Sequence, residues 1–193
     1  MDMDELNEKV FKDGAPRKTE RFHQIPIFSN LNGKEVGRIL RITDEVVIKT
    51  GEFVFQPGEA PDGFYILLDG RVDIRIPPGG PNQRETSIAT LSNRSVFGEM
   101  SFIGKRNRSA FAVALEETRL NKINGADFYD MLDKGDVAAY KVIYNCARLI
   151  GTRLRRVENE LLQVLSQLGP DTRKQKLAEL QEFRDTLFQE WSF

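Results

Sequence analysis

The central part of the chain alternates between apolar and polar residues in short runs. Val72, Ile74 and Ile76 are separated by polar residues, and glycine or proline residues stand between this run and its neighbours. The same period of two returns at residues 46–48, 53–55, 64–68 and 111–115, and two further short strands are expected around residues 88–91 and 120–123. A period of two is typical of β-strands, and many short strands with such breaks are typical of a sandwich or barrel. Residues 45–124 are therefore predicted to fold mainly as short strands.

The last third of the chain changes to the three- and four-residue spacing of helices. A short helix around Phe128 and Leu132 is predicted to end near Gly135, and a long helix to run from about Val137 to Leu168. Apolar residues recur along it at alternating steps of three and four, at Ala147, Ile150, Leu154, Val157, Leu161, Val164 and Leu168. Such a seam is typical of a coiled coil, so we expect the long helix to form a parallel homodimer.

Shorter helices are predicted on both sides of these regions. Val36 and Ile39 lie on one face of a helix that Ser29 or Asn30 could cap. Gly169-Pro170 ends the long helix, and a final helix follows. The apolar stripe of this final helix consists of Leu177, Leu180, Phe183, Leu187, Phe188 and Trp191. Two roles are open for the stripe: it packs onto the long helix or its dimer partner, or it binds a partner protein.

Composition and charge narrow the class of protein. The chain has 193 residues, a net charge of −1 and no apolar run near the roughly 18 residues that a membrane span needs. The near-neutral charge argues against a large nucleic-acid-binding surface. Cys146 and His23 are each the single residue of their type, which excludes an internal disulfide and histidine-based metal sites or triads. We expect a soluble, cytoplasmic protein with one domain and an appendage.

The clearest chemistry lies in the segment Phe97–Ala110. Gly98 and Glu99 open a short apolar run that is long enough for one helical turn, and Arg108 follows nine residues after Glu99. The free N–H groups at the start of such a turn favour an anion, and an arginine fork matches phosphate oxygens. A glutamate accepts hydrogen bonds, and sugar hydroxyls donate them. A ligand with a hydroxyl close to a phosphate, such as a ribose phosphate, fits these residues.

This segment resembles the phosphate-binding cassette of cyclic-nucleotide-binding domains, which reads Phe-Gly-Glu, a short apolar helix, and then Pro-Arg-Ala or Arg-Ser-Ala. The resemblance implies that Glu99 binds the ribose 2′-hydroxyl and that Arg108, together with Ser109, binds the cyclic phosphate of cAMP or cGMP. It also implies phosphate contacts from the backbone N–H groups of Gly98, Glu99 and Met100.

Two flanking segments carry the same resemblance, because residues 51–59 and 62–70 look like the first two sheet motifs of the family. The resemblance implies an α+β fold, a β-jelly-roll with flanking N-terminal helices and a long C-terminal dimerisation helix. The expected divisions are a mobile arm at 1–24, the jelly-roll domain at 25–134, the coiled-coil helix at 135–168 and an amphipathic helix at 169–193.

The chain departs from the family pattern at two places. The family usually has Gly-Asp where this chain has Arg94-Ser95, and we expect the change to alter the turn before the cassette. Regulators of the catabolite-activator type place a Thr-Ser pair on the long helix against adenine, and Val157 and Glu158 occupy those positions here. Arg153 falls on another position of this lid, so the resemblance implies a contact with the base. The identity of the base, adenine or guanine, stays open.

The resemblance also bears on the output of the protein. Residues 169–193 are too few for the winged helix-turn-helix that follows in catabolite-activator regulators. The chain is therefore expected to sense a cyclic mononucleotide and to signal through protein contacts, without binding DNA or a membrane.

Jelly-rolls also house metal-dependent cupin enzymes, but a single histidine cannot supply their metal ligands, so we expect that the protein is not an enzyme. Two alternatives stay open: a scaffold that binds no nucleotide, and a cyclic-dinucleotide receptor that uses Lys105 and Arg106 beside Arg108.

Overall fold

The computed structural model of the chain describes residues 22–78 and 84–190, without the side chains of residue 173 and of residues 182–190. Two compact units make up the chain, residues 1–149 and residues 150–193. The proposed arm at 1–24 lies almost wholly outside the described residues, as does Trp191 of the predicted C-terminal stripe. The first unit carries all the described strands and is the unit that positions the cassette.

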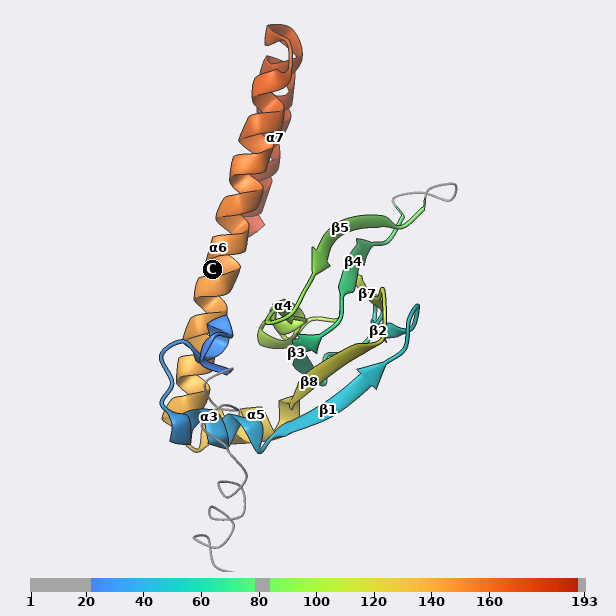
Figure 1. Cartoon of the computed structure of the whole chain (residues 1–193). Coiled ribbons are helices and arrows are strands. Elements are labelled where there is room, and N and C mark those ends of the chain that lie inside the picture. Colours follow the sequence, from blue (N-terminus) through green and yellow to red (C-terminus); the bar gives the residue numbers. More distant parts are fainter. Residues whose placement is uncertain (1–21, 79–83, 191–193) are drawn as a thin grey trace, which may run out of the picture. The chain divides into compact units, whose positions relative to one another are not determined.

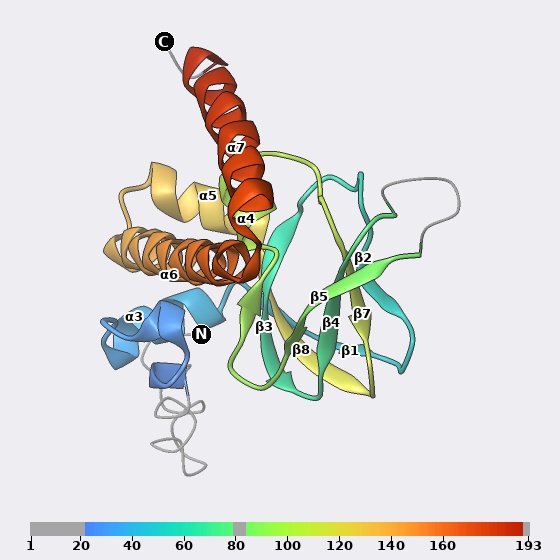
Figure 2. The ribbon, with the colours of Figure 1, turned by 90° about the horizontal axis from the view of Figure 1, so that it is seen from above.

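Two antiparallel sheets of four strands each form the core of the first unit (Figures 1 and 2). The strand orders are β1-β8-β3-β6 and β2-β7-β4-β5. The bounds are β1 Thr43–Ile48, β2 Phe53–Phe55, β3 Gly63–Asp69, β4 Val72–Ile76, β5 Thr86–Leu91, β6 Val96–Phe97, β7 Phe111–Ala114 and β8 Thr118–Asn124. This arrangement confirms the predicted β-jelly-roll and the period-two interpretation of residues 45–124.

Strand β3 is buried on both faces, because each face of its sheet meets a different apolar layer. Phe64 and Ile66 belong to the layer that also contains residues of the surrounding helices. Tyr65 and Leu67 point the other way, into the space between the two sheets. The inner layer consists of Phe55, Tyr65, Leu67, Val72, Phe97, Ala112 and Leu120. The alternation of these side chains in the sequence therefore predicts both layers.

Strand β4 departs from the simple alternation, since its polar residue Asp73 is only 6% exposed. Burial by itself would raise the pKa of the Asp73 carboxyl, but hydrogen bonds from Ser87 and Arg75 hold that pKa below its usual value. Ser87 Oγ donates at 2.6 Å and Arg75 Nε at 2.7 Å. A buried carboxylate is stable when donors satisfy it in this way.

Helices α3 (Gly33–Leu40) and α5 (Gly125–Asp133) lie on the same side of the strands (Figure 2). The short 3₁₀ helix Pro26–Phe28 precedes α3. The cap of α3 is Asn32, because its side chain accepts from Glu35 N–H while the Glu35 carboxylate accepts from Asn32 N–H. The predicted caps Ser29 and Asn30 are therefore wrong by two or three positions.

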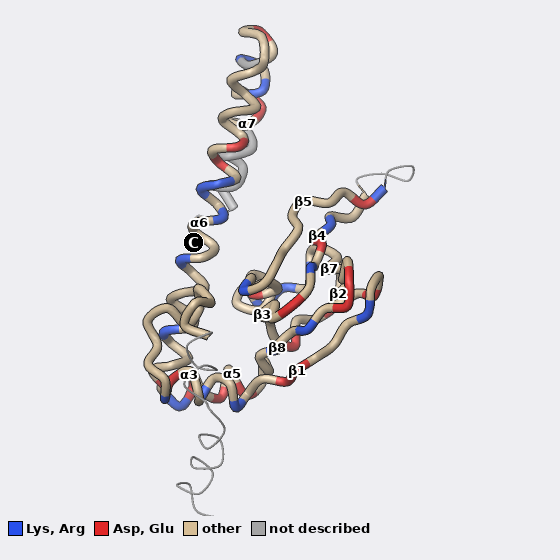
Figure 3. Tube along the Cα trace, in the orientation of Figure 1, with Lys and Arg blue, Asp and Glu red and all other residues tan. Residues whose placement is uncertain are grey.

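Helix α6 (Val137–Gln167) confirms the predicted long helix, and α7 (Pro170–Glu190) follows it. Two ion pairs hold the start of α6 to α3 within the first unit. Lys141 Nζ of α6 lies 2.8 Å from Glu35 Oε1, and Asp136 Oδ2, just before α6, lies 2.9 Å from Arg38 Nε. Acidic and basic residues are interspersed along the chain trace (Figure 3). Among the described residues, no helix has the length and apolar content that crossing a bilayer demands.

Candidate functional site

The cassette begins where the chain leaves β6 and enters the short helix α4 (Glu99–Ile103). Gly98 makes this turn with φ of +76°, a left-handed conformation that costs a side-chain-bearing residue free energy. A Cβ atom at Gly98 would also lie 2.8 Å from Arg108 Nη1 and 3.3 Å from Phe55 Cε1. Glycine is therefore required here both by the backbone and by the side chains packed against it.

The guanidinium of Arg108 is the centre of the site. Its side chain is 1% exposed, and it donates from Nη1 to Gly98 O at 2.6 Å and from Nη2 to Gly63 O at 2.7 Å. The face of the Phe55 ring lies beside it, with the ring centre 4.4 Å from Cζ. Asp62 Oδ1 is 3.9 Å from Nη2. Arg108 thus joins the cassette to β2 and to the start of β3.

The backbone around Arg108 is fixed by the turn that follows β2. Arg108 N–H donates to Glu59 O at 2.8 Å, and Gly58 N–H donates to Arg108 O at 2.8 Å. The Pro-Gly-Glu part of the predicted sheet motif at 51–59 therefore pairs directly with the cassette. Its role in the site is to hold the arginine backbone, which the sequence alone did not predict.

The electrostatic setting of Arg108 is that of a buried cation. Burial lowers the pKa of its guanidinium, and the nearby carboxylates of Asp62, Glu59 and Glu99 act in the opposite direction. Arginine stays protonated in proteins, so the side chain keeps its charge at neutral pH. A desolvated, protonated guanidinium whose orientation is fixed is well suited to bind a phosphate through paired hydrogen bonds.

The other predicted site residues take different positions around Arg108. Glu99 is 1% exposed at the start of α4, close enough to Arg108 for its carboxylate to act on the pKa of the guanidinium. Met100 has an exposed side chain and contributes its backbone to the same first turn, while Ser109 follows Arg108 and is exposed. The structure therefore brings Gly98, Glu99 and Arg108 together. Arg153 belongs to the unit 150–193, so its predicted contact with the base stays a prediction.

Lys105 and Arg106, the residues of the dinucleotide alternative, lie in the exposed loop after α4. The ammonium of Lys105 lies 5.1 Å from the centre of the Tyr129 ring of α5. This contact directs the lysine toward α5. Across the described ranges there is no cluster of three histidine, cysteine or acidic residues that could hold a metal ion.

The turn before the cassette keeps a glycine-like conformation despite its unusual sequence. Arg94 has φ of +73°, its N–H donates to Leu67 O at 2.7 Å, and Ser95 O accepts from Leu67 N–H at 2.8 Å. Arg94 therefore occupies the left-handed region that glycine adopts most readily, and the expected difference between this turn and that of the family stays a prediction. The arginine carries the strain of that conformation.

Replacing Arg94 by glycine should stabilise the protein, because glycine adopts the left-handed conformation without steric cost. We expect the free energy of unfolding to rise by about 0.5–1 kcal/mol. Glycine relieves the strain of the left-handed conformation, and part of that gain is offset because glycine also increases the entropy of the unfolded chain. Urea denaturation would measure the change in the free energy of unfolding. Arg94→Ala is the matched control, since alanine removes the same side chain but keeps the strain. An equal gain in both variants would show that the long side chain, and not the backbone, is the cause.

A separate groove of about 930 Å³ lies within the first unit and contains none of the predicted cassette residues. Its walls come from the residues before α3, from β1, β3 and β8, and from the turn at Asn93 and Arg94. Arg119 in this groove is paired with Glu45 at 2.7 Å. The groove is therefore distinct from the surroundings of Arg108.

Known proteins resemble this chain in sequence and in fold. Residues 45–135 match the family model of the cyclic nucleotide-binding domain. The cyclic AMP receptor protein of Thermus thermophilus is 31% identical over 137 residues, which are 70% of this chain and 60% of that protein. The crystal structure of the Thermus thermophilus catabolite activator protein has a TM-score of 0.62 and 28% identity, covering 72% of this chain and 62% of that one.

A further solved structure shows the likeness of fold. The cyclic nucleotide-binding domain from Methylobacillus flagellatus has a TM-score of 0.68 at 22% identity, covering 83% of this chain and 93% of that one. The chain spans 28% and 60% of the length of the first two curated relatives that it matches.

Proposed function

Because residues 45–135 belong to the cyclic nucleotide-binding domain family, we propose that this chain binds a cyclic mononucleotide, cAMP or cGMP, and acts as a sensor of it. The observation that carries the proposal is the state of Arg108, a buried guanidinium fixed by two backbone carbonyls in the cassette that the family uses for phosphate. The relative from Thermus thermophilus, named as a cyclic AMP receptor, supports cAMP as the first ligand to test.

Each cassette residue has a distinct role in this proposal. Arg108 binds the cyclic phosphate: two of its five N–H donors serve the carbonyls of Gly98 and Gly63, and this role assigns the remaining donors to phosphate oxygens. Glu99 accepts the ribose 2′-hydroxyl, as a carboxylate can accept but not donate. The backbone N–H groups of Gly98, Glu99 and Met100, together with the exposed Ser109 hydroxyl, complete the phosphate site.

Thermal unfolding in the presence of cAMP, cGMP or cyclic di-GMP tests the proposal. A ligand at about 100 times its dissociation constant stabilises the native state by roughly 2.7 kcal/mol, which for a chain of this size raises the midpoint by roughly 5–10 °C. We expect such a shift with one cyclic mononucleotide. No shift with any of the three at millimolar concentration would support the alternative of a scaffold without a nucleotide, and a shift with cyclic di-GMP alone would support the dinucleotide alternative.

We further propose that the protein is a homodimer through α6 and transmits the bound state through contacts of its C-terminal helices. Four apolar residues at heptad spacing, Leu154, Val157, Leu161 and Val164, are between 43% and 60% exposed within the described chain. An exposed apolar seam at this spacing is stabilised when a second helix covers it. Leu165, which follows Leu161 by four residues and so borders the same face, is by contrast only 6% exposed.

Replacing Leu161 by glutamate is expected to convert the dimer to a monomer, because each helix would place a carboxylate in an apolar seam. Sedimentation equilibrium at several concentrations would measure the mass. Leu162→Glu is the matched control: Leu162 is 62% exposed and lies next to the seam, so we expect that variant to remain dimeric. A wild-type protein that stays monomeric at about 100 µM, which corresponds to an association free energy weaker than about −5.5 kcal/mol, would contradict the dimer.

A further inference from the structure

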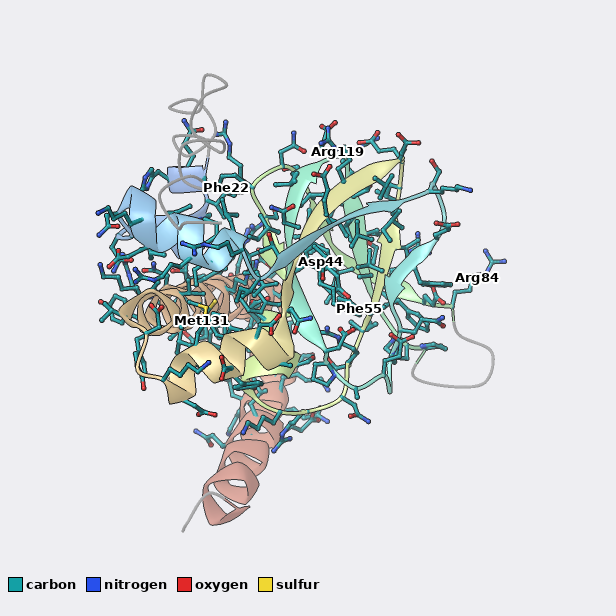
Figure 4. All side chains as sticks on the ribbon, turned by 90° about the horizontal axis from the view of Figure 1, so that it is seen from below. Phe22, Asp44, Phe55, Arg84, Arg119 and Met131 are labelled. Atoms are coloured by element: carbon teal, nitrogen blue, oxygen red, sulfur yellow. The ribbon has the colours of Figure 1, made fainter. Side chains whose placement is uncertain are left out.

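The aromatic ring of Phe55 is the one described side chain whose ring centre lies within 5 Å of the Arg108 guanidinium, at 4.4 Å from Cζ. Phe55 ends β2, is 7% exposed and lies among the strands of the roll (Figure 4). A cation within about 6 Å of an aromatic face is attracted by the negative charge of that face, and more strongly when water is excluded. Arg108 meets both conditions, since its side chain is 1% exposed.

Two further rings hold Phe55 in place. Its centre lies 5.9 Å from that of Tyr65 and 6.0 Å from that of Phe97, and these two rings stack at 5.4 Å. Tyr65 is itself 5.8 Å from Arg108 Cζ, whereas Phe97 has no such contact among the described residues. The three rings form a packed platform in the inner core, with Phe55 nearest to the cation.

The platform differs from the carbonyls in how it holds the arginine. Each hydrogen bond to a carbonyl oxygen occupies one N–H group of the guanidinium. The bonds from Nη1 to Gly98 O and from Nη2 to Gly63 O therefore reduce the number of donors available to a ligand. A ring face attracts the whole cation and occupies no N–H group. Gly98 also leaves no space for a Cβ beside Phe55 and Arg108, so the three residues are in close packing.

We propose that Phe55 is a positioning residue for nucleotide binding: its ring face holds the Arg108 guanidinium in place while leaving the remaining N–H groups free for the cyclic phosphate. This inference rests on the proposed function, because the ligand is the cyclic mononucleotide of that proposal. The ring sets the depth of the guanidinium, and the two carbonyls set its rotation. Phe55 makes its contribution through Arg108 and need not touch the nucleotide.

A series of fluorinated phenylalanines at position 55 tests the electrostatic part of this role. Each added fluorine weakens the negative ring face with little change in ring shape, so a core-packing role would give no trend. We expect the dissociation constant for the cyclic mononucleotide, measured by calorimetry, to rise with each fluorine, reaching roughly 3- to 30-fold in the trifluorinated ring. Phe55→Leu should show a similar loss, and Phe55→Tyr should retain the wild-type affinity.

The same fluorinated series at Phe97 is the matched control, because Phe97 packs in the same platform without contacting Arg108. We expect no trend there. A flat series at position 55 alongside normal wild-type affinity, or equal slopes at the two positions, would overturn the positioning role alone. Absence of any cyclic-nucleotide binding by the wild-type protein would overturn the proposed function, and the positioning role with it. Thermal unfolding of each ligand-free variant confirms that the compared proteins are folded.

Discussion

Replacing Arg108 by alanine is expected to weaken cyclic-nucleotide binding by about 2–4 kcal/mol, roughly 30- to 900-fold in the dissociation constant. The phosphate would lose its charge-assisted hydrogen bonds in a site where the wild-type side chain is 1% exposed. The carbonyls of Gly98 and Gly63 would also lose a donor each. Isothermal titration calorimetry with the nucleotide identified by thermal unfolding is the measurement.

Two further variants make the test specific to the guanidinium. Arg108→Lys keeps the charge but cannot reach both carbonyls and the phosphate with one ammonium, so we expect an intermediate loss of affinity. Arg71→Ala removes an arginine that is 57% exposed and paired with Glu116 at the surface, and we expect it to bind as the wild type does. An affinity of Arg108→Ala within threefold of the wild type would remove Arg108 from the phosphate site.

The sequence was sufficient to predict the elements of the fold and the position of the cassette. Alternating side chains such as those of Phe64 and Tyr65 face two different apolar layers, and that division depends only on the period of a strand. The long helix likewise follows from its apolar spacing. Glu99 and Arg108 are separated only by a short helix and a loop of fixed length, so their closeness follows from the local sequence.

The partners of Arg108 could not be predicted, because they come from distant parts of the chain. Gly63 O lies 45 residues away in sequence, and Phe55 is on the strand before it. The structure also shows that Gly98 makes room for Nη1 of Arg108, a contact between two parts of the cassette that the sequence did not reveal. Such contacts depend on how strands pair across the roll, and no local pattern carries that information.

Other differences have the same origin. Asp73 was predicted on the polar face of a half-buried strand, yet Ser87 of the neighbouring strand and Arg75 supply the hydrogen bonds that allow its burial. The period of two places Phe53 on the same face as Phe55, but the register shifts between them and Phe53 is 43% exposed. An irregular register changes the face of a side chain without any change in the apolar pattern.

Replacing Gly63 by alanine is expected to lower the free energy of unfolding by about 2–4 kcal/mol, because backbone strain adds to a direct clash. Gly63 has φ of +156°, and a Cβ there would lie 2.1 Å from Ile123 O on the paired strand β8. A backbone carbonyl cannot rotate away as a side chain can, so the start of β3 must move. Urea denaturation of the ligand-free protein is the measurement. An unchanged slope of the free energy of unfolding against urea concentration would show that the variant and the wild type expose the same surface on unfolding.

Gly51→Ala is the matched control for this variant. Gly51 also has a positive φ, +81°, but nothing lies within 4 Å of the added Cβ, so only the strain of about 1 kcal/mol should appear. The Gly63 variant should in addition bind nucleotide more weakly, because moving the start of β3 moves the carbonyl that orients Arg108 Nη2. Equal unfolding midpoints for the two variants would contradict the clash. Weaker binding by the Gly63 variant, with unchanged binding by the Gly51 variant, would support a link between the pairing of β3 with β8 and the orientation of Arg108.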